Sequence, residues 1–93
     1  MNRIETIIVT QILTRALIKG YMITIDTDGE DYDLENSTCE QEIFEAVFAC
    51  DYAKVIFRDA QFKRLGFIMF IYGNGEEVVS DYSDNEEMER LVN

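Results

Sequence analysis

The side chains of this chain that could do chemistry are mainly carboxylates, and they gather in two blocks. Residues 20–51 hold ten acidic residues and no lysine or arginine, and residues 73–93 hold seven acidic residues against one arginine. Two carboxylates can act as general acid and general base, but they need a substrate cleft, and 93 residues leave little room for one. No histidine is present to activate a serine or a cysteine. We therefore predict a protein that binds a partner and is not an enzyme.

The net charge of −11 is unevenly distributed, and its sign constrains the partner. A negative field repels nucleic acids and anionic membranes, and it attracts basic surfaces. We therefore expect no direct nucleic acid binding and no membrane binding. The expected partner is a basic protein or a nucleic-acid-binding complex. The alternative is that the acidic residues only keep the protein soluble.

Residues 21–36 have the pattern of a β-hairpin. Two alternating runs flank Asp28-Gly29, which is typical of a two-residue type I′ turn. In that register Ile25 pairs with Tyr32, and both side chains point to the core.

The second face of this predicted hairpin is acidic. Asp26 would stand directly opposite Asp31, and such a like-charged pair is unfavourable unless solvent or a cation screens it. Local stability does not explain this face, so it is the leading candidate binding surface. The predicted partner-binding residues on the hairpin, the following helix and the tail are Asp26, Asp28, Glu30, Asp31, Asp33, Glu35, Glu40, Glu76, Glu77, Asp81 and Asp84.

The same segment can be compared with a calcium-binding loop. In an EF-hand, Asp28 would precede the invariant glycine, and Glu35 would take the bidentate position. However, Thr24 stands where the first aspartate belongs, and no helix directly flanks the loop on its N-terminal side. The hairpin accounts for all of these residues, so we predict no metal and no cofactor.

The remaining elements follow from hydrophobic spacing and from turn signals. Residues 4–19 form a broad apolar helical face that ends at Gly20, although the β-branched residues 6–10 would also suit a strand. Residues 52–58 and 66–72 are predicted strands. Residues 76–82 are a predicted short strand or extended segment, and a short helix capped at Ser83 or Asp84 ends near Val92.

Ser37 and Glu40 have the spacing of a capping box, so a helix is predicted to start there. Cys39 and Cys50 would lie at its two ends, about 16 Å apart, which is too far for a disulfide. We expect two buried, reduced thiols.

The order α-β-β-α-β-β-(β)-α predicts one α+β domain over residues 1–93. Its antiparallel sheet would have four to five strands, with the helices packed on one side. The longest apolar runs are far shorter than the ~20 residues that span a bilayer.

A basic cluster separates the two acidic blocks. It consists of Lys54, Arg58, Lys63 and Arg64, with phenylalanines nearby, a combination also found in RNA-binding surfaces. Four cations attract nucleic acid only weakly in a chain of this net charge. Salt bridges, or contact with the acidic part of a second copy, are the preferred interpretation.

Two segments carry a resemblance to a known group of proteins. IMFIYGNGEEVVSDYSDN (residues 68–85) and KGYMITIDTDGE (residues 19–30) resemble the tail and the first hairpin of small acidic hypothetical proteins of bacteriophages and plasmids. The matching tail residues are Tyr72, Gly73, Asn74, Gly75, Glu77, Val78, Val79, Ser80, Asp81 and Tyr82. Gln61-Phe62 departs from the Asp-Gly pair expected there, so an exposed Phe62 is a candidate contact residue.

Gly73-x-Gly75 lacks the third glycine of a nucleotide loop and is predicted to be a β-turn.

The resemblance implies an origin in a mobile element, and it implies no particular activity. Small acidic phage and plasmid proteins often counter host defences, and several anti-restriction and anti-CRISPR proteins imitate DNA phosphates. The predicted function is therefore inhibition of a host defence complex by DNA mimicry, in the cytoplasm of the host cell. The alternative is a structural or oligomeric interaction module, such as a homodimer joined through sheet edges or the first helix.

Overall fold

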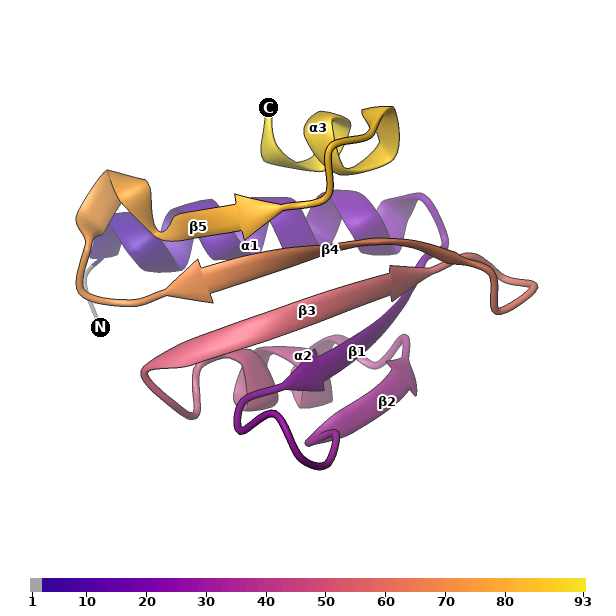
Figure 1. Cartoon of the computed structure of the whole chain (residues 1–93), viewed down its shortest axis with the longest axis horizontal. Helices are drawn as coiled ribbons and strands as arrows, with labels where there is room; N and C mark the ends of the chain where they lie inside the picture. Colours follow the sequence, from indigo (N-terminus) through magenta and orange to yellow (C-terminus); the bar gives the residue numbers. More distant parts are fainter. Residues whose placement is uncertain (1–2) are drawn as a thin grey trace.

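A computed structural model describes residues 3–93 and arranges them as three α-helices and a five-stranded antiparallel sheet (Figure 1). The elements are α1 (Arg3–Ile18), β1 (Met22–Asp26), β2 (Leu34–Ser37), α2 (Glu40–Val47), β3 (Tyr52–Arg58), β4 (Arg64–Ile71), the 3₁₀ turn η1 (Gly75–Glu77), β5 (Val79–Tyr82) and α3 (Glu86–Val92). The strands lie in the order β2-β1-β3-β4-β5. The predicted α+β class and the predicted order of elements are confirmed.

The three α-helices pack on one face of the sheet, and one apolar core lies between the two layers (Figure 1). Alternate residues of the strands supply one wall of this core, and the apolar faces of the helices supply the other. The buried side chains are Val9, Ile12, Leu13, Ala16, Ile43, Val47, Met88 and Leu91 from the helices and Ile23, Ile25, Ala53, Val55, Phe57, Ile68 and Phe70 from the strands. Burial of each large aliphatic side chain contributes roughly 1.5–3 kcal/mol.

The other face of the sheet carries no helix of the described residues, and we call it the open face. Strand alternation and register place on it Met22, Thr24, Asp26, Tyr52, Lys54, Ile56, Arg58, Phe67, Met69, Ile71 and Asp81. Ile56, at its centre, is nevertheless only 3% exposed. The side chains around Ile56 therefore form a second, thin packing layer on this face.

Gly20 ends α1 as predicted. Its φ of +81° lies in the left-handed region that glycine adopts without strain. The Gly20 N–H donates to the Leu17 carbonyl, and the Tyr21 N–H donates to the Ala16 carbonyl, which is the hydrogen-bond pattern of a Schellman motif. The chain then turns directly into β1.

The predicted caps at Ser37 and at Ser83 or Asp84 are wrong, because the N-cap residues are Cys39 and Asn85. Ser37 is the last residue of β2 and pairs with Ile23, so α2 begins only at Glu40. At the start of α3, Ser83 still exchanges hydrogen bonds with Phe67. Asn85 caps α3 instead, and its side-chain oxygen accepts the Met88 N–H at 2.9 Å.

The predicted burial of the two cysteines is also wrong. Cys39 is the N-cap residue of α2, and Cys50 lies beyond the end of that helix at Val47. Both thiols are exposed and free. The helix is shorter than predicted, so neither cysteine reaches its apolar face.

None of the helices formed by residues 3–93 has the length and apolar character needed to cross a bilayer.

Candidate functional site

The connection between β1 and β2 is a seven-residue loop, residues 27–33, and not a two-residue turn. Ile25 pairs with Leu34 and Ile23 pairs with Ser37, so the predicted register is wrong. Tyr32, predicted to lie in the core, is 46% exposed. We call residues 26–35 the acidic loop, which comprises this connection and the strand residues that border it. It contains six acidic residues.

Aspartate side chains bind the backbone of this loop and thereby replace the predicted strand pairs. The Asp26 Oδ1 atom accepts the Gly29 N–H at 2.8 Å, and the Asp28 Oδ1 atom accepts the Glu30 N–H at 2.9 Å. The Asp33 Oδ2 atom accepts both the N–H and the hydroxyl of Thr27, at 2.9 and 2.6 Å. Such local bonds offer the backbone an alternative to a sheet ladder.

In the described part of the chain, no lysine or arginine forms an ion pair with the acidic loop. Within residues 3–93, the one ion pair within 4.0 Å joins Arg90 to Glu86 on α3. Glu30, Asp31 and Glu35 are exposed. The loop therefore presents several carboxylates to solvent, and the backbone fixes those of Asp26, Asp28 and Asp33 through one oxygen each.

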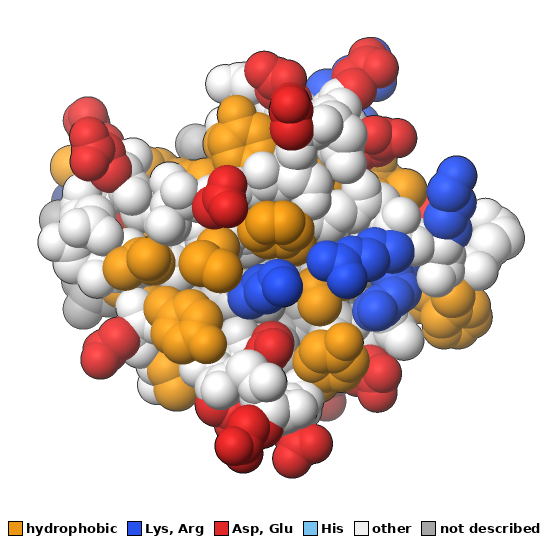
Figure 2. All heavy atoms as spheres, in the orientation of Figure 1, with side chains coloured by type: hydrophobic (Ala, Val, Ile, Leu, Met, Phe, Trp, Pro, Cys, Tyr) orange, Lys and Arg blue, Asp and Glu red, His pale blue; other side chains and the backbone are white. Residues whose placement is uncertain are grey.

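The predicted site residues of the tail do not join this surface. Glu40 opens α2, whereas Glu76, Glu77, Asp81 and Asp84 lie in or beside η1, β5 and the start of α3. The sheet order puts β2 and β5 at opposite edges. Figure 2 shows acidic side chains at the top and bottom of the molecule, with lysine and arginine side chains between them. The two acidic blocks are thus separated on this face.

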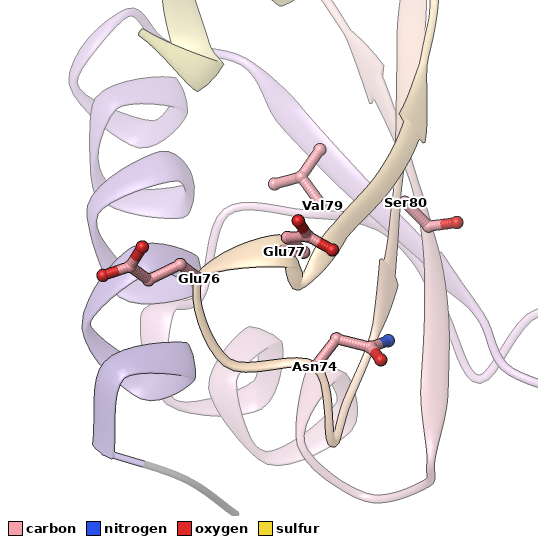
Figure 3. Close-up of a pocket in the computed structure, with 5 residues that line it drawn as sticks. All are labelled: Asn74, Glu76, Glu77, Val79 and Ser80. Carbon is pink, nitrogen blue, oxygen red and sulfur yellow. The ribbon is translucent and has the colours of Figure 1, made fainter.

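A depression of about 530 Å³ lies beside η1 and β5, lined by Asn74, Glu76, Glu77, Val79 and Ser80 (Figure 3). The side chains of Glu76 and Glu77 point in different directions, and Glu76 extends away from the other labelled side chains. These carboxylates therefore do not converge on one point, which a carboxylate pair that acts on one bond would have to do.

The glycine turn at residues 73–75 binds a carboxylate that the sequence does not reveal as its partner. The N–H groups of Gly73, Asn74 and Gly75 donate to the Glu5 Oε2 atom at 2.7, 2.7 and 2.8 Å. Successive N–H groups that converge in this way form an anion-binding nest. Glu5 is fully buried in α1, so the turn is filled internally and ties α1 to the end of β4.

Tyr72 directly precedes the glycine turn that forms this nest, and the charge of Glu5 affects the pKa of its phenol. Burial of its ring, and secondly the negative charge of Glu5, raise the pKa of the Tyr72 phenol above its ordinary value. The hydroxyl donates a hydrogen bond to the Val47 carbonyl at 2.5 Å. The protonated phenol therefore ties the residue that follows β4 to the end of α2.

The basic cluster lies on and beside the open face. The Arg58 guanidinium donates to the Thr24 hydroxyl at 3.0 Å and to the Asn36 side-chain oxygen at 3.1 Å. The Lys54 ammonium stands 5.1 Å from the centre of the Phe67 ring. Phe62, in the β3–β4 turn, is 63% exposed. Strand alternation in residues 52–58 predicts that Lys54 and Arg58 share a face, and the structure confirms it. That Thr24 and Phe67 lie on the same face depends on the register of β1, β3 and β4.

No group of three or more potential metal-ligating side chains lies close enough to hold an ion among residues 3–93. Comparison of the chain with protein-family models, with curated proteins and with solved structures finds no match.

Proposed function

We propose that this protein is a non-enzymatic binding protein that docks its acidic loop onto a basic surface of a partner. The observation that carries the proposal is that three of the six loop carboxylates, those of Asp26, Asp28 and Asp33, are held by backbone N–H groups, and that no ion pair within residues 3–93 involves the loop. A partner therefore breaks no internal ion pair. The loop is also ordered before binding, which lowers the entropy cost of association.

The partner that suits this loop best is a protein surface that binds nucleic acid. Six carboxylates within ten residues make a local charge density that such a surface is built to accept. Binding by the loop would block that surface sterically and electrostatically. In its specific form, the proposal is inhibition of a host nucleic-acid-binding defence complex, of the restriction or CRISPR kind, inside the host cell.

The proposal assigns docking to the acidic loop and not to the tail acids, because the two groups lie at opposite edges of the sheet. This assignment gives a matched pair of variants. The loop variant combines Glu30→Lys, Asp31→Lys and Glu35→Lys, and none of these side chains supports the loop backbone through a described hydrogen bond. The tail variant combines Glu76→Lys, Glu77→Lys and Asp84→Lys. Each reversal adds two charges, so both variants change from −11 to −5.

The experiment immobilises wild type and both variants and exposes them to a bacterial lysate at low and high salt. We expect wild type and the tail variant to retain a basic nucleic-acid-binding protein at low salt, and duplex DNA to displace it. We expect the loop variant to lose it. Equal retention by the loop variant, or retention that DNA does not affect, would refute the proposal.

A further inference from the structure

We propose that the open face of the sheet is a docking surface for the acidic loop of a second copy of this chain. This inference goes beyond the proposed function, because it concerns self-association and needs no host partner. It rests on three features of the open face: its cations, its apolar side chains, and the lack of an ion pair between those cations and the acids of residues 3–93.

The cations of the basic cluster have no carboxylate partner within residues 3–93, although the chain carries 19 acidic residues and only 8 basic ones. Arg58 is fixed by two neutral oxygens, those of Thr24 and Asn36. A guanidinium has five N–H donors, so most of them remain for an anion. An anionic partner would therefore find this cation already positioned.

The acids of the same chain do not fill this role. Asp26 stands opposite Lys54 in the β1–β3 register, yet no ion pair joins the two. The Asp26 Oδ1 atom instead accepts N–H groups of Asp28 and Gly29 within the loop. The Lys54 ammonium faces the Phe67 ring.

The open face also has an apolar part next to the cations. Tyr52 pairs with Ile71, and Met69 pairs with Lys54, so these side chains adjoin the positive charges. Figure 2 shows the hydrophobic side chains beside the band of lysine and arginine. Ile71 is 37% exposed. A matching partner must therefore present acidic groups together with an apolar one.

The acidic loop has this composition. Tyr32 is 46% exposed and stands between Asp31 and Asp33 in the sequence. Two copies related by a twofold axis would place each loop on the open face of the other, which gives a closed, isologous dimer. In the alternative dimer, in which the basic clusters of the two copies stack directly on each other, like charges would face each other. A nucleic acid strand would meet the acidic edges of the sheet and the net charge of −11.

The test is a charge swap read out as the oligomeric state. The face variant carries Lys54→Glu and Arg64→Glu, and it leaves Arg58 in place because Arg58 supports the sheet. The exchange variant carries Glu30→Lys and Asp31→Lys. The control carries Arg3→Glu and Lys19→Glu, which are exposed at the start of α1 and just after its end and match the charge change of the face variant. Circular dichroism verifies that each variant is folded.

We expect wild type and the control to form dimers in sedimentation equilibrium at low salt and to dissociate as salt rises. Each swapped variant alone should have a dimer dissociation constant raised by about ten-fold or more. An equimolar mixture of the face and exchange variants should form a heterodimer, since both contacts are restored. A monomeric wild type, or a mixture that stays monomeric, would overturn the inference. So would tight binding of a fluorescent single-stranded oligonucleotide that the face variant loses.

Discussion

At the scale of single residues, the most informative group is a carboxylate inside the core. Glu5 is fully buried, and three backbone N–H groups donate to one of its oxygens. Hydrogen bonds to a charged acceptor are shorter and stronger than neutral ones. Glu5 therefore links the first turn of α1 to a turn that is 68 or more residues away.

Glu5→Gln should lower the free energy of unfolding by about 1.5–3 kcal/mol, because the substitution keeps the shape but removes the charge that accepts the three N–H groups. Urea denaturation measures this loss. Glu86→Gln is the control, since it breaks the exposed Arg90–Glu86 pair and should cost at most about 1 kcal/mol. Equal effects of the two substitutions would show that the nest does not stabilise the fold.

Tyr72 gives a prediction about alkaline pH. Its pKa is raised in the folded protein, chiefly by burial, so the folded state keeps the phenol proton more tightly than the unfolded state does. The stability that this supplies is fully present below the unfolded pKa of about 10 and is lost as pH rises through the folded value. The loss is at most about 1.4 kcal/mol per pH unit, and solvent reduces it because the ring is half-buried.

Tyr72→Phe should therefore be less stable than wild type at pH 8, by about 0.5–1.5 kcal/mol for the hydrogen bond to Val47. Above pH 10 its stability should fall less steeply, so the two curves converge. Denaturation at a series of pH values from 8 to about 11.5 measures this. The stability of Tyr32→Phe, a substitution at an exposed site, should fall as steeply as that of wild type. Parallel curves for wild type and Tyr72→Phe would contradict the account.

At the scale of elements, α3 depends on a glycine in β4. A Cβ atom added at Gly66 would lie 2.6 Å from the Met88 Cγ atom, and Met88 is fully buried. The helix can pack this closely because the strand carries no side chain at that position.

Gly66→Ala should destabilise the fold by about 1–3 kcal/mol, because Met88 or the whole of α3 must move. Met88→Ala should cost about 2–5 kcal/mol through the cavity that it leaves. The double variant should cost less than the two single effects added together, and thermal denaturation of all four proteins completes this cycle. If the two single losses of stability add up to that of the double variant, Gly66 and Met88 do not constrain each other sterically.

The elements also show why sequence patterns predict some features and not others. The apolar run of β4 and the glycine after α1 depend on neighbours in the chain, and both predictions are confirmed. The hairpin register failed because Asp26 and Asp33 bind backbone groups of the loop, and this competes with strand pairing. The predicted helix starts were wrong because Ser37 is still part of β2 and Ser83 is still hydrogen-bonded to Phe67 of β4. The spacing of hydrophobic residues along the chain does not indicate where side chains compete with strand pairing for backbone hydrogen bonds.

For the candidate site, the sequence shows which residues are acidic and which are basic, but it does not show how the fold arranges them in space. Whether the two acidic blocks merge depends on the strand order, and that order puts them at opposite edges. The partner of the glycine turn, Glu5, is equally invisible in the sequence, because nothing local links residues 5 and 73. Both facts depend on long-range packing.

At the scale of the whole molecule, charge is segregated and not balanced in pairs. Acidic edges border a face that carries cations, and one described ion pair lies away from both, on α3. Under the two proposals, the acidic loop binds either a basic partner or a second copy. The two uses exclude each other, so a basic partner would dissociate the dimer.

The central claim is that the acidic loop, and not net charge alone, binds the basic partner. The most direct test is the association rate of the retained host protein with wild type, the loop variant and the tail variant over a range of ionic strength. We predict a rate that falls steeply with salt for wild type and the tail variant, and a slow rate with little salt dependence for the loop variant. Because both variants have the same net charge, identical salt dependences for them would contradict the account.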